Sequence, residues 1–135
     1  MKILLDTHIL LWTLSDNPNL SQKAREIILD ERNMLYYSAV SLWEIELKHI
    51  AKPKILTTSA EEIHRYCQKS GSFDLLEFST SDIFCMNQLR RKPDTPEHHD
   101  PFDRLLLVQA INNNFQFMTH DFLITGYDSN NIIHV

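Results

Sequence analysis

Acidic side chains stand where apolar segments of this chain end or are interrupted, and the principal ones are Asp6, Glu44, Asp103 and Asp121. Asp6 closes the apolar run over residues 3–5, and Asp121 follows the run over 115–119. The carboxyl ends of parallel strands meet at one edge of an α/β sheet, so these acids are expected to gather there. Carboxylates are the hard oxygen ligands that Mg²⁺ and Mn²⁺ prefer. The sequence therefore predicts a divalent-metal site, with Asp100 as a further candidate ligand.

Each acid also has an ordinary structural alternative. Asp100 before Pro101 matches a helix N-cap with proline at the first helical position, which places Asp103 where any acid suits the helix dipole. Ser41 and Glu44 fit a Ser-x-x-Glu capping box. Asp121 could cap a turn over 122–126, and Asp6 could simply end a strand. Capping does not explain why a parallel sheet would gather all of them, and it is compatible with metal binding.

The elements that position these acids alternate between strands and helices. Apolar runs predict strands over 2–6, 34–37, 73–78, 115–119 and 132–135. Apolar periodicity and capping signals predict helices over 7–15, 21–32, 38–50, 59–70, 81–89 and 103–112. Such alternation predicts one α/β domain over residues 1–135, with a mostly parallel sheet.

Two helices carry informative apolar patterns. Residues 103–112 are apolar nearly all round, which predicts a buried helix. In the helix over 38–50 the stripe Val40, Trp43, Leu47 and Ile50 is predicted to face the core. Trp12 and Trp43 are accordingly interpreted as core residues rather than platforms for base stacking. The polar, proline-punctuated segment 90–99 is predicted to be a loop.

Composition limits the function classes. The net charge of −5 argues against tight, salt-driven nucleic-acid binding through the bare surface, although part of that charge belongs to the predicted metal site. Cys67 and Cys85 lack metal-type spacing and are expected to be free, as in a reducing cytoplasm. No apolar stretch approaches the roughly 20 residues that cross a bilayer, so a soluble cytoplasmic protein is expected.

The histidines do not form a recognisable zinc motif. His98 and His99 are neighbours in the predicted loop, and the others show no His-x₃-His spacing. His99 and His120 flank predicted ligands, where contact with a substrate phosphate is an alternative to an ordinary surface role.

Four motifs in chain order resemble the PIN-domain ribonucleases, specifically the VapC-type toxins of bacterial toxin–antitoxin pairs. They are LLDTHILLW over 4–12, SAVSLWEIELK over 38–48, HDPFDRLLLVQA over 99–110 and THD over 119–121. The resemblance spans essentially the whole chain. It implies a PIN-like three-layer α/β/α sandwich in which Asp6, Glu44, Asp103 and Asp121 bind Mg²⁺ or Mn²⁺.

The resemblance also implies an activity and partners. The expected reaction is cleavage of RNA phosphodiesters by a metal-activated water, leaving a 5′-phosphate and a 3′-hydroxyl. The expected partners are a small cognate antitoxin and a second copy of the chain. Thr7, Ser38 and Thr119 would be hydroxyls that support the metal ligands. RNA contacts would have to come from Lys48, Lys52, Lys54, Arg90, Arg91, Lys92 and Arg104.

Two other functions use a similar arrangement of residues. A phosphoacceptor signalling domain also gathers acids around magnesium, but it needs a lysine after a late strand, where this chain has Thr119 and His120. A catalytically silent binding module could retain the PIN fold, and the complete set of acids argues against it.

Overall fold

The computed structural model describes residues 1–135, and its centre is a five-stranded sheet in the order β3-β2-β1-β4-β5. Every neighbouring pair of strands is parallel, which confirms the predicted parallel sheet. The strands are β1 (Lys2–Leu5), β2 (Met34–Ser38), β3 (Phe73–Leu76), β4 (Gln116–Thr119) and β5 (Ile132–His134).

All the predicted helices are present, with ends that shift by a few residues. The α-helices are α1 (Thr7–Leu14), α2 (Gln22–Leu29), α3 (Ala39–Ala51), α4 (Ala60–Ser70), α5 (Thr80–Cys85) and α6 (Pro101–Asn112). Two 3₁₀ turns are η1 (Met86–Gln88) and η2 (Phe122–Gly126). The helix predicted over 81–89 is therefore a short α-helix that continues as a 3₁₀ turn.

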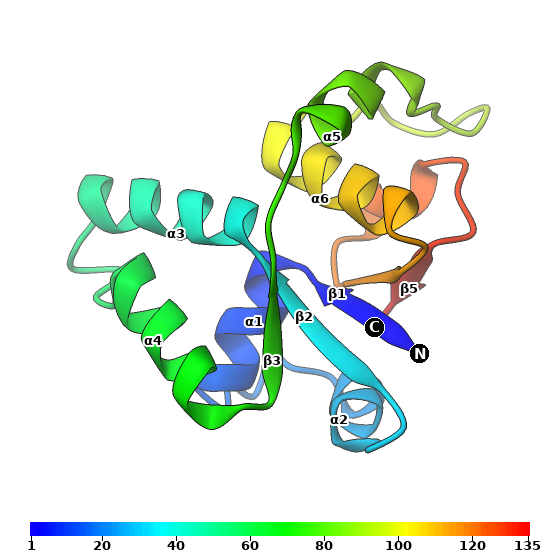
Figure 1. Cartoon of the computed structure of the whole chain (residues 1–135). Helices are drawn as coiled ribbons and strands as arrows, with labels where there is room; N and C mark the ends of the chain where they lie inside the picture. Colours follow the sequence, from blue (N-terminus) through cyan, green and yellow to red (C-terminus); the bar gives the residue numbers. More distant parts are fainter.

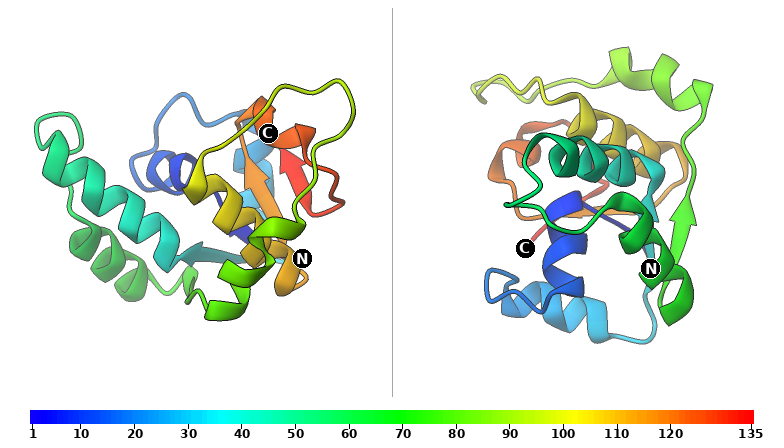
Figure 2. Two further views of the ribbon diagram at one scale, coloured as in Figure 1. Left: turned by 90° about the horizontal axis from the view of Figure 1, so that it is seen from above. Right: turned by 90° about the vertical axis from the view of Figure 1, so that its left-hand side faces the viewer.

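The strands bury opposite faces against different helices, which gives three layers (Figures 1 and 2). Ile3 and Leu5 of β1 join the apolar cluster that also contains residues of α1, α2 and α4. Leu4, which points to the other face, joins a second cluster dominated by α6. This alternation is the side-chain period of a strand covered on both sides. The expected α/β/α sandwich is confirmed.

The prediction for the apolar stripe of α3 was wrong beyond its first residue. Val40 is fully buried, but Trp43, Leu47 and Ile50 are 51%, 46% and 71% exposed. The other buried residues of the helix are Ser41, Glu44 and Ile45, and its far end projects away from the sheet beside α4 (Figure 2). Helical periodicity identifies a stripe but cannot tell where the supporting sheet ends.

Helix starts explain a second correction. α3 begins at Ala39, and the Ser38 hydroxyl accepts the backbone N–H of Val40 as its N-cap. Ser41 lies inside the helix, so the capping box predicted for Ser41 and Glu44 is absent.

Both cysteines are free, with Cys67 buried and Cys85 half-buried. None of the helices combines the length and the apolar character that a bilayer crossing requires.

Candidate metal centre

Asp6 lies at the carboxyl end of β1 and caps α1. Its Oδ1 accepts the backbone N–H of Thr7 at 2.7 Å, and its Oδ2 accepts the Thr119 hydroxyl at 2.6 Å. Burial raises the pKa of this carboxyl to about 6, while the two hydrogen bonds and the charge of Glu44 act as smaller influences. Asp6 is thus a buried carboxyl whose position is fixed by the sheet and by the end of β4.

Asp103 enters the same region from the first turn of α6. Asp100 is the N-cap, and its Oδ1 accepts the backbone N–H groups of Phe102 and Asp103. Burial, followed by the negative charges of Asp6, Asp100, Glu44 and Asp121, raises the Asp103 pKa to about 8. The structure therefore brings the predicted acids close enough for their charges to oppose ionisation of Asp103.

Glu44 projects from the buried side of α3. Its Oε2 lies 3.2 Å from Lys48 Nζ, one helical turn away, whereas its Oε1 is buried without a hydrogen-bond partner. An unpartnered buried carboxylate oxygen is costly unless it is protonated or meets a positive group. This oxygen therefore favours a cation at the same edge of the sheet.

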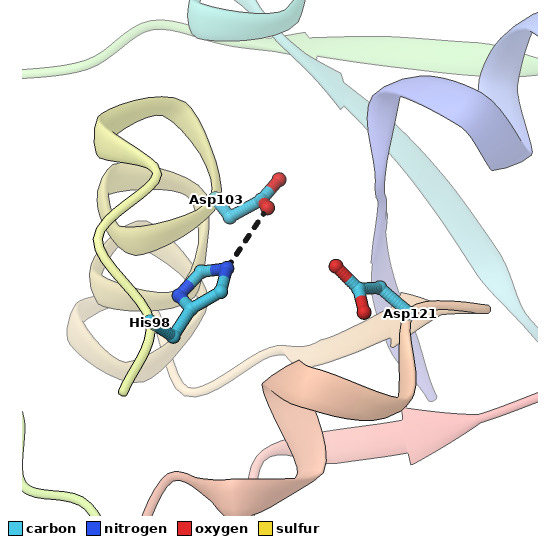
Figure 3. Close-up of side chains that lie close together, drawn as sticks. All are labelled: His98, Asp103 and Asp121. Carbon is cyan, nitrogen blue, oxygen red and sulfur yellow. Dashed lines mark hydrogen bonds and ion pairs between the residues drawn. The ribbon is translucent and has the colours of Figure 1, made fainter. Parts of the chain in front are cut away.

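Asp121 follows β4 and faces Asp103 from the start of η2. Its Oδ1 accepts the backbone N–H of Leu123, so it caps η2, and its other oxygen accepts no hydrogen bond. The predicted capping role and a ligand role can coexist, because capping uses one oxygen. Figure 3 shows the Asp121 carboxylate facing Asp103 and His98, and one potential ligand atom from each of the three lies within 4.8 Å of the others.

His98 is the residue that the sequence pattern missed. It is buried, its Nδ1 lies 2.7 Å from the Tyr127 hydroxyl, and its Nε2 lies 3.2 Å from Asp103 Oδ2. Burial lowers the pKa of His98, so the contact with Asp103 is a neutral hydrogen bond rather than an ion pair at pH 7. His99 is even closer in sequence to the predicted ligands, so no sequence signal singles out His98, and only the fold shows that His98 is buried while His99 is exposed.

The three predicted supporting hydroxyls have different partners. Thr119 binds Asp6 directly and also accepts the backbone N–H of Asp121, so it links two acids. Thr7 donates to the Ser41 hydroxyl, and Ser38 donates to Gln109. Ser41, which the sequence suggested only as a helix cap, and Gln109, which it did not single out, thus form buried polar contacts with two of these hydroxyls.

Most of the basic residues predicted to contact RNA are engaged with the protein. Arg91 donates to the carbonyls of Pro96 and Leu123, and Arg104 donates to the Tyr127 hydroxyl and the Met86 carbonyl. Arg90 and Lys92 also bond backbone carbonyls. Lys52 and Lys54 are exposed, and Lys48 pairs with Glu44. Beside the acids the exposed positive charge is therefore that of Lys52, together with Lys48, which is paired with Glu44; both line one pocket with Glu44 and Asp100.

Aromatic rings border the other side of the acids. Trp12 is half-buried, and its ring centroid lies 4.4 Å from that of His120, which in turn lies 5.4 Å from His8. Burial lowers the pKa of both histidines, so this border is neutral at pH 7. His99 is exposed and bonds Glu97. The rings shape the rim without adding positive charge.

The donor set fits a divalent cation. Asp6, Glu44, Asp103 and Asp121 offer carboxylate oxygens from four different elements, and Glu44 Oε1 has no other partner. Burial raises the pKa values of Asp6 and Asp103, and the neighbouring negative charges raise them further. A bound cation would relieve both effects, since opposite charge favours the ionised carboxylates. Hard oxygen donors favour Mg²⁺ or Mn²⁺.

Comparisons with known proteins identify the fold and the family. VapBC2 from Rickettsia felis, solved bound to a DNA fragment from their promoter, superposes with a TM-score of 0.66 at 17% identity, covering 100% of this chain and 98% of that one. VapBC-1 from nontypeable Haemophilus influenzae gives 0.56 at 15% identity, with 93% of each chain covered. A search of curated protein sequences found no match. The PIN-domain family model matches residues 3–125, and the chain belongs to the PIN-domain family.

Proposed function

We propose that this chain is a metal-dependent endoribonuclease of the VapC type, the toxin of a toxin–antitoxin pair. The observation that carries the proposal is the approach of Asp6, Glu44 and Asp121 to Asp103 at one sheet edge. Burial first, and then these neighbouring charges, raise the pKa of Asp103 to about 8. The family membership and the similarity to the two VapBC structures support it. The proposed setting is the cytoplasm, with a small antitoxin and a second copy of the chain as partners.

The four acids would hold Mg²⁺ or Mn²⁺, with Asp100 at the rim. When bound, the metal supplies an activated water and stabilises charge on the scissile phosphate. Thr119 fixes the position of Asp6 relative to the start of η2, because its hydroxyl contacts both. Asp100 fixes the first turn of α6, which sets the direction of Asp103. None of these acids needs to be the general base.

A groove beside the acids is the candidate path for the RNA strand. It has a volume of about 470 Å³ and is lined by Glu44, Lys48, Lys52, Asp100 and Phe102, among others. The lysine ammonium groups can meet backbone phosphates, and the exposed face of Trp43, which packs edge-on against Phe102 at 4.9 Å, lies beside them. The acidic end of this groove would place a phosphodiester against the metal.

Cleavage assays with the full chain test the proposal. Single-stranded RNA should be cut in the presence of Mg²⁺ or Mn²⁺ and left intact in excess chelator, and restoring the metal should restore cleavage. Asp74→Asn, which changes an exposed acid in β3, is the control variant and should cleave RNA as the parent does. Cleavage that continues undiminished in chelator would exclude the metal mechanism. Metal binding without cleavage of any RNA would instead favour the silent binding module.

A further inference from the structure

His98 is a buried imidazole that faces the acids from outside the predicted ligand set. It lies between η1 and α6, and its side chain is only 5% exposed. Its Nε2 points at Asp103, while Asp121 faces the same space from the start of η2 (Figure 3). The unpartnered Oε1 of Glu44, whose charge also acts on Asp103, independently favours a positive group at this edge.

The hydrogen bonds around Tyr127 assign the tautomer of His98. The Tyr127 hydroxyl lies 2.7 Å from His98 Nδ1, 3.2 Å from the His98 carbonyl oxygen and 3.4 Å from Arg104 Nη1. A phenol has one hydrogen and two lone pairs. All three contacts are satisfied only if the hydroxyl donates to the carbonyl and accepts from Arg104 and from Nδ1–H. The lone pair of the imidazole is then on Nε2.

That lone pair faces Asp103 Oδ2 at 3.2 Å. Two acceptors at this distance need a proton or a cation between them. Histidines that bind metals usually donate the other ring N–H to an oxygen, which fixes the tautomer and the ring orientation. The Tyr127 hydroxyl provides that oxygen. In the metal-free protein the neutral Asp103 carboxyl supplies that proton, and a bound cation would take its place. His98 therefore has the surroundings of a residue that can bind a metal.

The spacing of the donors suits one small ion. The ligand atoms of His98, Asp103 and Asp121 lie within 4.8 Å of one another. Ligands about 2.1 Å from one ion lie between about 3.0 Å (neighbouring) and about 4.2 Å (opposite) apart, so closure requires shifts of up to about 2 Å. Side-chain rotation of Asp121, whose second oxygen accepts no hydrogen bond, can provide this movement.

We propose that His98 Nε2 is a nitrogen ligand to the cation held by Asp103 and Asp121, and that it makes the site prefer Mn²⁺ to Mg²⁺. This inference rests on the metal site of the proposed function and specifies its selectivity. Imidazole nitrogen binds transition-metal ions well, whereas Mg²⁺ demands oxygen ligands. An all-carboxylate site would lack this preference.

The rival role for His98 is to position Asp103 by donating a hydrogen bond from Nε2–H. His98→Gln separates the two roles, because a glutamine amide can still donate to Asp103 but is a poor substitute for an imidazole ligand. His99→Ala is the matched control: it removes the neighbouring imidazole, which is exposed and bonded to Glu97.

Electron spin echo spectroscopy of the full-length protein loaded with Mn²⁺ alone reads the ligand directly. Nitrogen coupling to Mn²⁺ is expected in the parent and in His99→Ala, and it should disappear in His98→Gln. Calorimetry should show Mn²⁺ affinity lowered about tenfold or more in His98→Gln. Mg²⁺ affinity should change by less than about threefold, because Mg²⁺ depends on the oxygens.

The outcomes distinguish this inference from the proposed function. Tight Mn²⁺ binding by the parent without nitrogen coupling would overturn the role of His98 and leave the acidic metal site standing. No binding of Mn²⁺ or Mg²⁺ by the parent would overturn both. The parent spectrum decides the inference even if His98→Gln fails to fold. Unchanged Mn²⁺ affinity in a folded His98→Gln protein would assign His98 to positioning.

Discussion

Asp6 is buried and Asp103 is half-buried, and these two carboxyls of the candidate site are held differently. Asp6 accepts hydrogen bonds from Thr7 and Thr119, and its pKa is raised to about 6. Asp103 is surrounded by like charges and contacts His98, and its pKa is raised to about 8. Hydrogen bonds to a carboxylate offset part of the cost of burial, whereas neighbouring acids add to it. The Asp103 side is therefore where the metal-free site is most strained electrostatically.

The largest expected effect is on catalysis, where the two acids should behave alike. Asp6→Asn and Asp103→Asn should each lower RNA cleavage by at least about a hundredfold, because each would remove a carboxylate from the proposed metal site while keeping the size of the side chain. Asp100→Asn, which retains the N-cap, should keep partial activity. Initial cleavage rates at saturating Mg²⁺ measure this. Full activity in Asp6→Asn would remove that residue from the ligand set.

The pH dependence of the stability of the metal-free protein should distinguish Asp103 from Asp6. A folded-state pKa near 8 and an ordinary value of 3.8 mean that the native state binds more protons than the unfolded state between these values. The free energy of unfolding should therefore fall as pH rises from about 4 to about 8. Melting temperatures in chelator should decline across this pH range. In Asp103→Asn the decline should be shallower in the upper part of the range. A parent whose melting temperature rises from pH 6 to 8 would contradict the pKa of Asp103.

Removing the hydroxyl that supports Asp6 should make that acid resemble Asp103. Thr119→Val deletes the bond to Asp6 Oδ2 and should cost about 1–3 kcal/mol, because a buried polar group loses its partner. It should also raise the Asp6 pKa further. Denaturant unfolding in chelator at pH 5 and pH 8 measures both effects, with a larger loss at pH 8. Thr125→Val is a control, since Thr125 bonds the Phe122 carbonyl within η2. An equal loss at the two pH values would show that Thr119 does not influence Asp6 ionisation.

The smallest expected effect is at Asp121. In chelator, Asp121→Asn should melt at or slightly above the parent temperature, because it removes a negative charge while retaining an oxygen that can cap η2. Mg²⁺ should raise the melting temperature of the parent more than that of the variant, because a ligand stabilises the state that binds it. Equal shifts in the two proteins would leave Asp121 with its capping role alone.

The sequence predicted what depends on strand ends and missed what depends on loops. Asp6 and Asp121 follow strands of a parallel sheet, so their convergence could be expected from topology. The place of His98 depends on the chain between η1 and α6 and on its contact with Tyr127, which no local pattern encodes. Glu44 was located correctly on its helix, but the buried face of α3 was not, because the sheet supports only part of that helix.

The basic residues show a similar limit. Lysines and arginines near a predicted site look available for RNA in a sequence, yet Arg91 and Arg104 are committed to carbonyls and to the Tyr127 ring and hydroxyl. Leu123 and Tyr127 lie in η2 and directly after it, and Met86 lies in η1, so each of these partners is distant in sequence from the arginine that it contacts. Composition therefore indicated a modest cationic surface, and only the fold distinguishes the free lysines from the structural arginines.

Proton release on metal binding tests most directly whether the carboxyls with raised pKa values, above all Asp103, are the metal ligands. Calorimetric titration of Mg²⁺ in buffers of different ionisation enthalpy counts the protons expelled per ion. Near pH 7 the parent should release about one proton, chiefly from Asp103, because ligating carboxylates must be ionised. The release should fall toward zero above the Asp103 pKa and should be lost in Asp103→Asn. Mg²⁺ binding at pH 7 without proton release would contradict a metal site built on Asp103.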